Sequence, residues 1–344
     1  MKKFRTFLIV TLKDSELIKT LDFSNSNFSL ELIPESTGCY WEFEGGKSEI
    51  KYNRGKDYNE IKDKTQLRQN ELIISAENED IADNALSLIK GGMILAFPSP
   101  YVTLLDLSVT EIKATDAQFY KENPKYFHKI HSVGFGCQIL EKIIENKECS
   151  YALEKYKVSL ELHSFNPSSA DPIYGQVFDH YSHQKQTHTR SAFAIISAFS
   201  VIEELGLEIR SSAKNPRFLE PENGKWNPKV LNNIEERLKK IGIEANATFD
   251  WVFRGEQTEV EKDFKPYFGY DSQWINYGNN VRDKTLSFPE AIHNSSYLRN
   301  FIASHKFKEL TEFISPYDVF NVQCLARKLI IESLGMWKKM INTD

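Results

Sequence analysis

Alternating hydrophobic and polar residues mark the first part of the chain, up to about residue 110. Phe28, Leu30 and Leu32, for example, fall on one side of an extended segment, because successive side chains of a strand point to opposite faces. Gly45 and Gly46 separate two such segments and suit a hairpin turn. The pattern predicts strands at 4–12, 28–33, 40–43, 49–52, 72–75, 93–97 and 102–107.

Apolar residues recur every three to four positions in one early segment and in most of the chain after residue 116, which is typical of amphipathic helices. The early helix is expected over Glu79–Lys90, with Gly91 and Gly92 ending it. Later helices are predicted at 135–147, 150–163, 186–206, 228–241, 295–308 and 316–341, with a loop over 211–228.

The last of these helices has the clearest start signal. Ser315 suits the N-cap, Pro316 the first helical position and Asp318 the first turn. The helix at 186–206 differs in being apolar nearly all round, as expected for the middle of a bundle.

Together these patterns predict an α+β protein in two parts. Residues 1–115 form a β-rich or mixed N-terminal module, and residues 116–344 form an all-α helical bundle whose main region is 186–341.

The net charge of −5 argues against a protein whose whole surface attracts nucleic acid, but the charge is distributed unevenly along the chain. Residues 1–179 carry 21 Lys and Arg against 27 Asp and Glu (21 − 27 = −6), and the rest carries 22 against 21 (22 − 21 = +1). RNA is therefore expected to contact the second part, and the acidic first module is expected to act as a sensor or regulator.

The four cysteines, Cys39, Cys137, Cys149 and Cys324, have no metal-binding or redox spacing, which favours reduced thiols and a cytoplasmic location. No apolar run approaches the ~18 residues that a membrane span needs, so no membrane partner is expected.

Most familiar catalytic motifs are missing from the sequence. It has no nucleotide-binding glycine loop, no serine nucleophile elbow and no H-E-x-x-H, and Gly134-Phe135-Gly136 suits a turn. The clustered histidines lack the neighbouring ligands of a zinc site, so neither a metal nor another cofactor is expected. These histidines are His128 and His131, and His180, His183 and His188.

The segment from Tyr297 to Lys306 carries a different chemistry. Arg299 can hold a phosphate oxygen and offset transition-state charge, and His305 can move protons at a ribose 2′-OH or a leaving oxygen. Asn300 can position the pair. The alternative is a half-buried histidine beside a surface arginine, since His305 shares a helix face with Leu298.

This segment resembles the HEPN ribonucleases, whose hallmark is Arg, a polar residue and a His four to six residues after the Arg, followed by a long closing helix. Arg299, Asn300 and His305 match that pattern. The resemblance implies a helical bundle, a homodimer with its two motifs across a cleft, and metal-independent RNA cleavage that leaves a 2′,3′-cyclic phosphate. It also implies a role in antiviral defence, abortive infection or toxin–antitoxin systems, with an antitoxin or another defence protein as a partner.

Other residues are candidates for supporting roles. Glu203 or Glu204 can orient Arg299, unless both lie in water at a helix end. Tyr270, Trp274 and Arg282 suit stacking on unpaired bases, although packing between helices is the alternative. Lys306 is a further candidate RNA contact.

The sequence thus predicts a metal-independent endoribonuclease that acts as a homodimer. The alternative is a non-catalytic HEPN-like module that binds RNA or protein, and a third hypothesis is a metal hydrolase using His180, His183 and His188.

Overall fold

The computed structural model describes residues 1–11, 26–44, 47–53, 67–96, 110–111, 133–163, 185–251, 284–304 and 316–338. These residues form two compact units, which divide between Glu145 and Asn146. The domain boundary expected between residues 115 and 116 lies outside the described residues. Among the described helices, none is long and apolar enough to cross a membrane.

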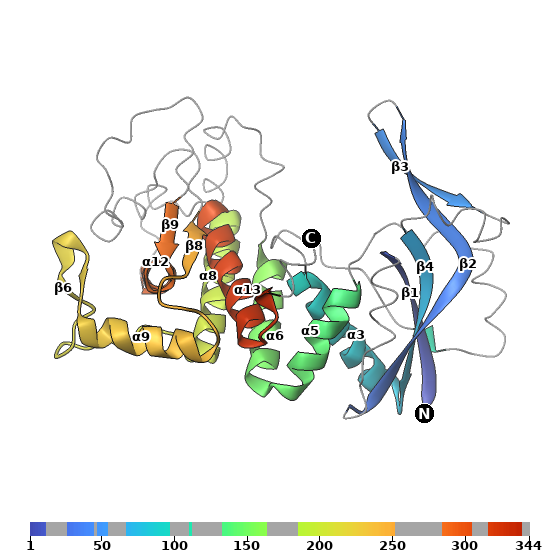
Figure 1. The fold of residues 1–344 in the computed structure, drawn as a ribbon, viewed down its shortest axis with the longest axis horizontal. Coiled ribbons are helices and arrows are strands. Elements are labelled where there is room, and N and C mark those ends of the chain that lie inside the picture. Colours follow the sequence, from blue (N-terminus) through green and yellow to red (C-terminus); the bar gives the residue numbers. More distant parts are fainter. Residues whose placement is uncertain are drawn as a thin grey trace. The chain divides into compact units, whose positions relative to one another are not determined.

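The first unit contains a five-stranded antiparallel sheet with the order β3-β2-β4-β1-β5 (Figure 1). Its strands are β1 (Lys2–Thr11), β2 (Phe28–Glu44), β3 (Lys47–Asn53), β4 (Leu67–Ala76) and β5 (Thr110–Glu111). The predicted strands at 28–33 and 40–43 are both parts of β2. Their separation in the sequence pattern reflects a register shift between Pro34 and Gly38, after which β2 pairs mainly with β3.

Helix α3 (Glu79–Ala96) supplies much of the hydrophobic core of this unit. Asn78 caps its start, since the Asn78 Oδ1 accepts a hydrogen bond from the Ile81 N–H at 3.0 Å. The helix continues through Gly91 and Gly92, so the predicted end at these glycines and the predicted strand at 93–97 are wrong. The core residues are Phe4, Phe28, Leu72, Ile74, Ala76, Ala82, Ala85, Leu86, Ile89, Met93 and Leu140.

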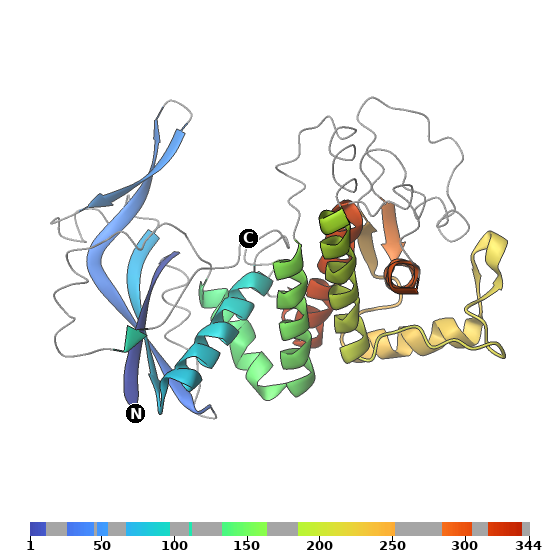
Figure 2. The same cartoon turned by 180° about the vertical axis from the view of Figure 1, so that it is seen from behind.

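The reason lies in the crossing of α3 with α5 (Val133–Glu145), which Figures 1 and 2 both show side by side. A Cβ on Gly92 would lie 2.2 Å from the carbonyl oxygen of Gly136, and a Cβ on Gly136 would lie 2.7 Å from the Met93 nitrogen. These glycines let two helix backbones touch. The predicted turn at 134–136 is likewise part of a helix.

The second unit is a helical assembly around α8 (Lys185–Glu204), which packs against three other helices. These are α6 (Lys147–Leu162), α12 (Phe288–Ser304) and α13 (Pro316–Ser333). Two buried hydrogen bonds connect three of the four helices. The Ser159 Oγ donates to the Ala194 carbonyl at 2.7 Å, and the Gln323 Nε2 donates to the Ser159 Oγ at 2.9 Å. The predicted central helix is confirmed.

Two short strand pairs accompany these helices. The segment expected as a loop over 211–228 contains β6 (Phe218–Glu220) and β7 (Lys225–Trp226), which lead into α9 (Pro228–Lys240). The second pair is β8 (Thr248–Trp251) with β9 (Lys284–Ser287). The second part was expected to be all-α, and it contains two short strand pairs in addition to its helices. The protein is a mixed α+β protein with antiparallel sheets.

Helix α12 begins earlier than the predicted residue 295, because Ser287 and Glu290 form a capping box. The backbone N–H and the hydroxyl of Ser287 both donate to the Glu290 Oε2 at 2.8 Å. Helix α13 begins at Pro316 as predicted but ends at Ser333, not at 341. Gly335, with φ of 64°, forms a left-handed turn there, and its N–H donates to the Glu332 carbonyl at 2.8 Å.

Candidate functional site

Arg299 lies near the end of α12 and is held by two neighbours. Its Nη1 donates to the Asn300 Oδ1 at 2.9 Å, and its Nη2 lies 3.3 Å from the Glu203 Oε1 on α8. Its guanidinium carbon lies 5.7 Å from the centre of the Phe199 ring. The two hydrogen bonds orient the guanidinium. Because 38% of the Arg299 side chain is exposed, an anion can also reach it.

The two candidate carboxylates of α8 have different partners. Glu203 contacts Arg299 of α12, whereas the Glu204 Oε2 lies 2.6 Å from the Lys155 Nζ on α6. Neighbouring residues on a helix point about 100° apart, so the pair reaches the helices on both sides of α8. Of the two carboxylates, Glu203 is the one in position to orient Arg299.

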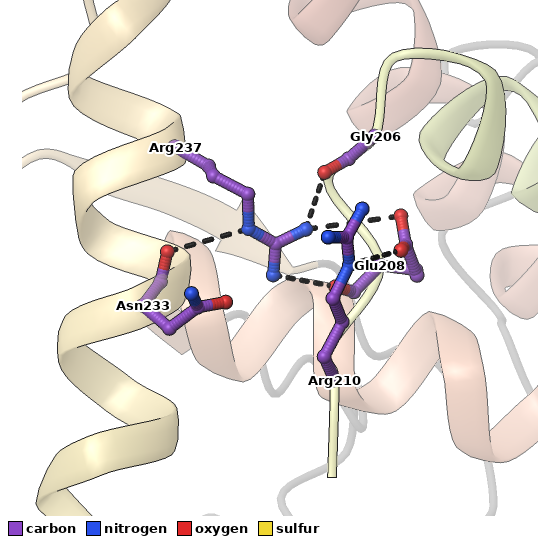
Figure 3. Close-up of polar contacts among 5 residues, drawn as sticks. All are labelled: Gly206, Glu208, Arg210, Asn233 and Arg237. Carbon is purple, nitrogen blue, oxygen red and sulfur yellow. Dashed lines mark hydrogen bonds and ion pairs between the residues drawn. The ribbon is translucent and has the colours of Figure 1, made fainter.

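A third cation, Arg237 of α9, binds just beyond the end of α8 (Figure 3). Its Nη1 donates to the Gly206 carbonyl, its Nη2 to the Glu208 carbonyl at 2.7 Å, and its Nε to the Asn233 carbonyl at 3.3 Å. The Glu208 carboxylate also pairs with the Arg210 Nε at 2.6 Å. Carbonyl groups at a helix C-terminus attract cations. Arg237 thereby fixes α9 to the end of α8.

A second polar cluster lies on α12, toward its beginning. The Arg217 Nη1 lies 2.6 Å from the His293 Nδ1, and the Arg217 Nη2 lies 3.5 Å from the Ser296 Oγ. Burial, and next the charge of Arg217, hold the pKa of His293 well below its usual value. A neutral imidazole accepts the Arg217 N–H at Nδ1, which places its own proton on Nε2.

Aromatic side chains surround this histidine. The ring centres of Phe218 and Trp226 lie 4.9 and 6.1 Å from that of His293, both edge-on, and that of Tyr297 lies 6.5 Å away. Phe218 is buried, whereas Trp226 and Tyr297 are partly exposed. The β6–β7 hairpin therefore docks on α12 through a guanidinium and two aromatic rings.

Several of the residues singled out by the sequence lie outside the described residues. They are His305 and Lys306, Tyr270, Trp274 and Arg282, and His128, His131, His180 and His183. His188 is described and lies on α8. Across the described ranges, no group of three or more His, Cys, Asp or Glu side chains is placed to hold a metal ion.

Sequence reasoning missed Arg217 and His293, which are 76 positions apart. The signals available were the Arg-Phe-Leu segment before a turn and the polar run His293-Asn294-Ser295-Ser296 within a helix. Neither signal identifies the other as its partner.

Comparison of the chain with known protein families, with curated proteins and with solved structures finds no match.

Proposed function

We propose that this protein is a metal-independent endoribonuclease of the HEPN type, with Arg299 and His305 as its catalytic residues and Asn300 as the residue that positions them. Arg299 binds the scissile phosphate and stabilises the charge that develops on it. His305 acts as an acid–base at the 2′-OH or at the leaving 5′-oxygen. Cleavage leaves a 2′,3′-cyclic phosphate.

The observation that carries the proposal is the geometry around Arg299. An accessible guanidinium is held on one edge by the amide of Asn300 and on another by the carboxylate of Glu203. An oriented arginine near the end of a helix can bind a phosphate without first losing much conformational freedom. In the sequence, His305 follows Arg299 by six positions and comes directly after Ser304, the last residue of α12.

A straight helix would place Arg299 and His305 about 120° apart around its axis and about 9 Å apart along it. A second copy across a two-fold axis brings the missing half of each site, so the proposed active form is a homodimer. Mixing Arg299→Ala chains with His305→Ala chains tests this arrangement, because activity should reappear in the mixed dimer. An active monomer would contradict it.

The main experiment incubates the purified full chain with single-stranded RNA and EDTA and identifies the new ends by mass spectrometry. We expect cleavage with cyclic phosphate ends, and a loss of about 10²–10⁴-fold in rate for His305→Ala and for Arg299→Ala. A folded His305→Ala protein that cleaves at the parent rate would show that the catalytic assignment is wrong. Binding without cleavage would indicate the non-catalytic module, and cleavage only with a metal ion would indicate the metal hydrolase.

Glu203 and Glu204 provide a matched pair for the role of the carboxylate. Glu203→Gln removes the charge that orients Arg299 and should slow cleavage, with little change in RNA affinity. Glu204→Gln removes the same charge one residue along the helix, where the partner is Lys155, and should leave the rate near that of the parent. Equal effects of the two substitutions would exclude a specific role for Glu203.

The defence or toxin setting is part of the proposal, and expression in growing cells tests it through growth arrest that depends on His305.

A further inference from the structure

Exposed apolar side chains are concentrated on two neighbouring helices of the second unit. Tyr151 and Val158 of α6 are 56% and 46% exposed, and Phe193 of α8 is 55% exposed. In the described part of the chain, the other large apolar side chains that are exposed are Met1, at the terminus, and Leu219, on the β6–β7 hairpin. Single exposed apolar residues are ordinary, whereas a group of them on one face is typical of an interface.

Helix α13 covers one side of the α6–α8 pair. Figure 1 shows α13 in front of both helices, and Figure 2, seen from behind, shows it beyond them. Gln323 of α13 donates to Ser159, which lies about 80° around α6 from Tyr151. Lys155, which contacts α8, lies at about 40° in the same direction, whereas Val158 lies about 20° in the other direction. Tyr151 and Val158 are therefore on the side of the pair that faces away from α13.

Phe193 lies on the same open side, between the parts of α8 that contact α6 and α12. The Ser197 Oγ donates to a carbonyl of α6 at 2.8 Å, and the Glu203 carboxylate contacts Arg299 of α12. Ser197 lies about 40° around α8 from Phe193 in one direction, and Glu203 lies about 80° from it in the other. Ala194, about 60° beyond Ser197, is fully buried, so the covered side of α8 begins there.

The two helices run antiparallel, which places the three exposed side chains along one strip. Hydrogen bonds join position 159 of α6 to position 194 of α8, and position 155 to positions 200 and 204. Val158 therefore lies at nearly the same height as Phe193, and Tyr151 lies seven residues, or about 10 Å, further along, at the height of Glu203. The apolar strip of Tyr151, Val158 and Phe193 thus extends to the height of Glu203 and its partner Arg299.

The polar groups next to the apolar strip already have partners. The Ser197 Oγ donates to the Lys155 carbonyl, and the Ser200 Oγ donates to the Ser197 carbonyl at 2.7 Å. The Lys155 ammonium and the Glu204 carboxylate, 2.6 Å apart, neutralise each other. A partner that covers the strip removes apolar surface from water and leaves these groups hydrogen-bonded, and both effects favour association.

We propose that a second copy of this chain packs on the apolar strip and that this contact forms the proposed homodimer. The candidate site needs a partner copy because Arg299 and His305 diverge around one helix axis, and a copy seated on the strip lies next to Arg299. The two serines beside Phe193 are small, so the partner's Phe193 can pack against them, as a two-fold symmetric contact requires. This inference rests on the proposed function, which calls for the second copy.

Sedimentation of the purified full chain over a range of concentrations tests the interface. Phe193→Glu places an unpaired charge on the strip of both copies and should raise the Kd of the dimer about 100-fold or more, with a parallel loss of RNA cleavage. The matched control is Leu219→Glu, which makes the same change at a side chain that is 53% exposed on the hairpin. The control should leave the Kd of the dimer unchanged.

Circular dichroism and thermal unfolding identify the folded variants, and Val158→Lys provides a second charge on the strip if Phe193→Glu does not fold. A parent chain that stays monomeric at all concentrations refutes the interface. Dimerisation of the folded strip variant as tight as that of Leu219→Glu refutes it equally. A parent dimer that Phe193→Glu dissociates but that does not cleave RNA in EDTA would refute the proposed function and leave the interface standing.

Discussion

Replacing Arg237 by alanine should destabilise the second unit strongly, because this side chain fixes α9 to the end of α8. Only 14% of the Arg237 side chain is exposed, and its guanidinium donates to the carbonyls of Gly206 and Glu208 (Figure 3). A hydrogen bond to a charged group contributes about 1.5–3 kcal/mol, so the loss of two predicts about 3–6 kcal/mol. For a unit of this size that corresponds to a fall in Tm of about 6–24 °C.

Tryptophan fluorescence during urea and thermal unfolding measures this effect. Of the five tryptophans only Trp41 precedes residue 146, so the signal reports mainly on the second unit. Arg237→Lys keeps a cation near the end of α8 but loses the planar fork, and about half of the stability loss is expected. Arg210→Ala is the control, with a change of about 0–1 kcal/mol for an exposed ion pair. If Arg237→Ala and Arg210→Ala unfold at the same temperature and urea concentration, the contacts of Arg237 with the end of α8 contribute nothing measurable to stability.

Three further substitutions test other parts of the structure by thermal or denaturant unfolding. Gly92→Ala should lower the stability of the first unit, although alanine favours helices by about 1 kcal/mol, because its Cβ would collide with Gly136; exposed Asn84→Ala on the same helix should not. Asn294→Leu should raise stability by about 1–3 kcal/mol, because neither amide atom of this fully buried side chain has a hydrogen-bond partner in the described structure, and a loss of stability would contradict this reasoning. Burial, and secondly Arg190, lower the pKa of His163 from 6.5 to about 4, so between these pH values the unfolded chain binds more protons and the free energy of unfolding falls as the pH is lowered. His163→Gln should weaken that fall, and an unchanged pH profile would exclude His163 as its source.

Local sequence signals predicted the elements that depend on local interactions. The start of α13 follows from Pro316, and the end of α8 near Gly206 follows from the left-handed turn that glycine permits, with φ of 65°. The start of α12 also has a local signal, since Ser287 and Glu290 have the spacing of a capping box. The prediction relied on apolar periodicity instead and therefore began the helix at residue 295.

Signals that depend on distant parts of the chain were misread or missed. In the sequence, Gly92 looks like the end of a helix. Its position inside α3 is explained only by the close contact with Gly136 on another helix, which a side chain would prevent. The contact of Arg299 with Glu203 was among the sequence hypotheses because an acidic residue in an apolar helix needs a polar partner. Arg217 had no such cue, since a surface arginine in a loop is ordinary and its partner His293 is remote in sequence.

The convergence of three cations on the end of α8 also has a consequence for the order of folding. Lys155 precedes Glu204 by 49 positions, whereas Arg237 follows Gly206 by 31 and Arg299 follows Glu203 by 96. At a synthesis rate of about 5–20 residues per second, roughly 5–20 s pass between the addition of Glu203 and that of Arg299. During this interval α8 can pair with α6 while its other side waits for α12. Arg299 thus joins Glu203 late in synthesis, and a chain that stops before α12 lacks this ion pair.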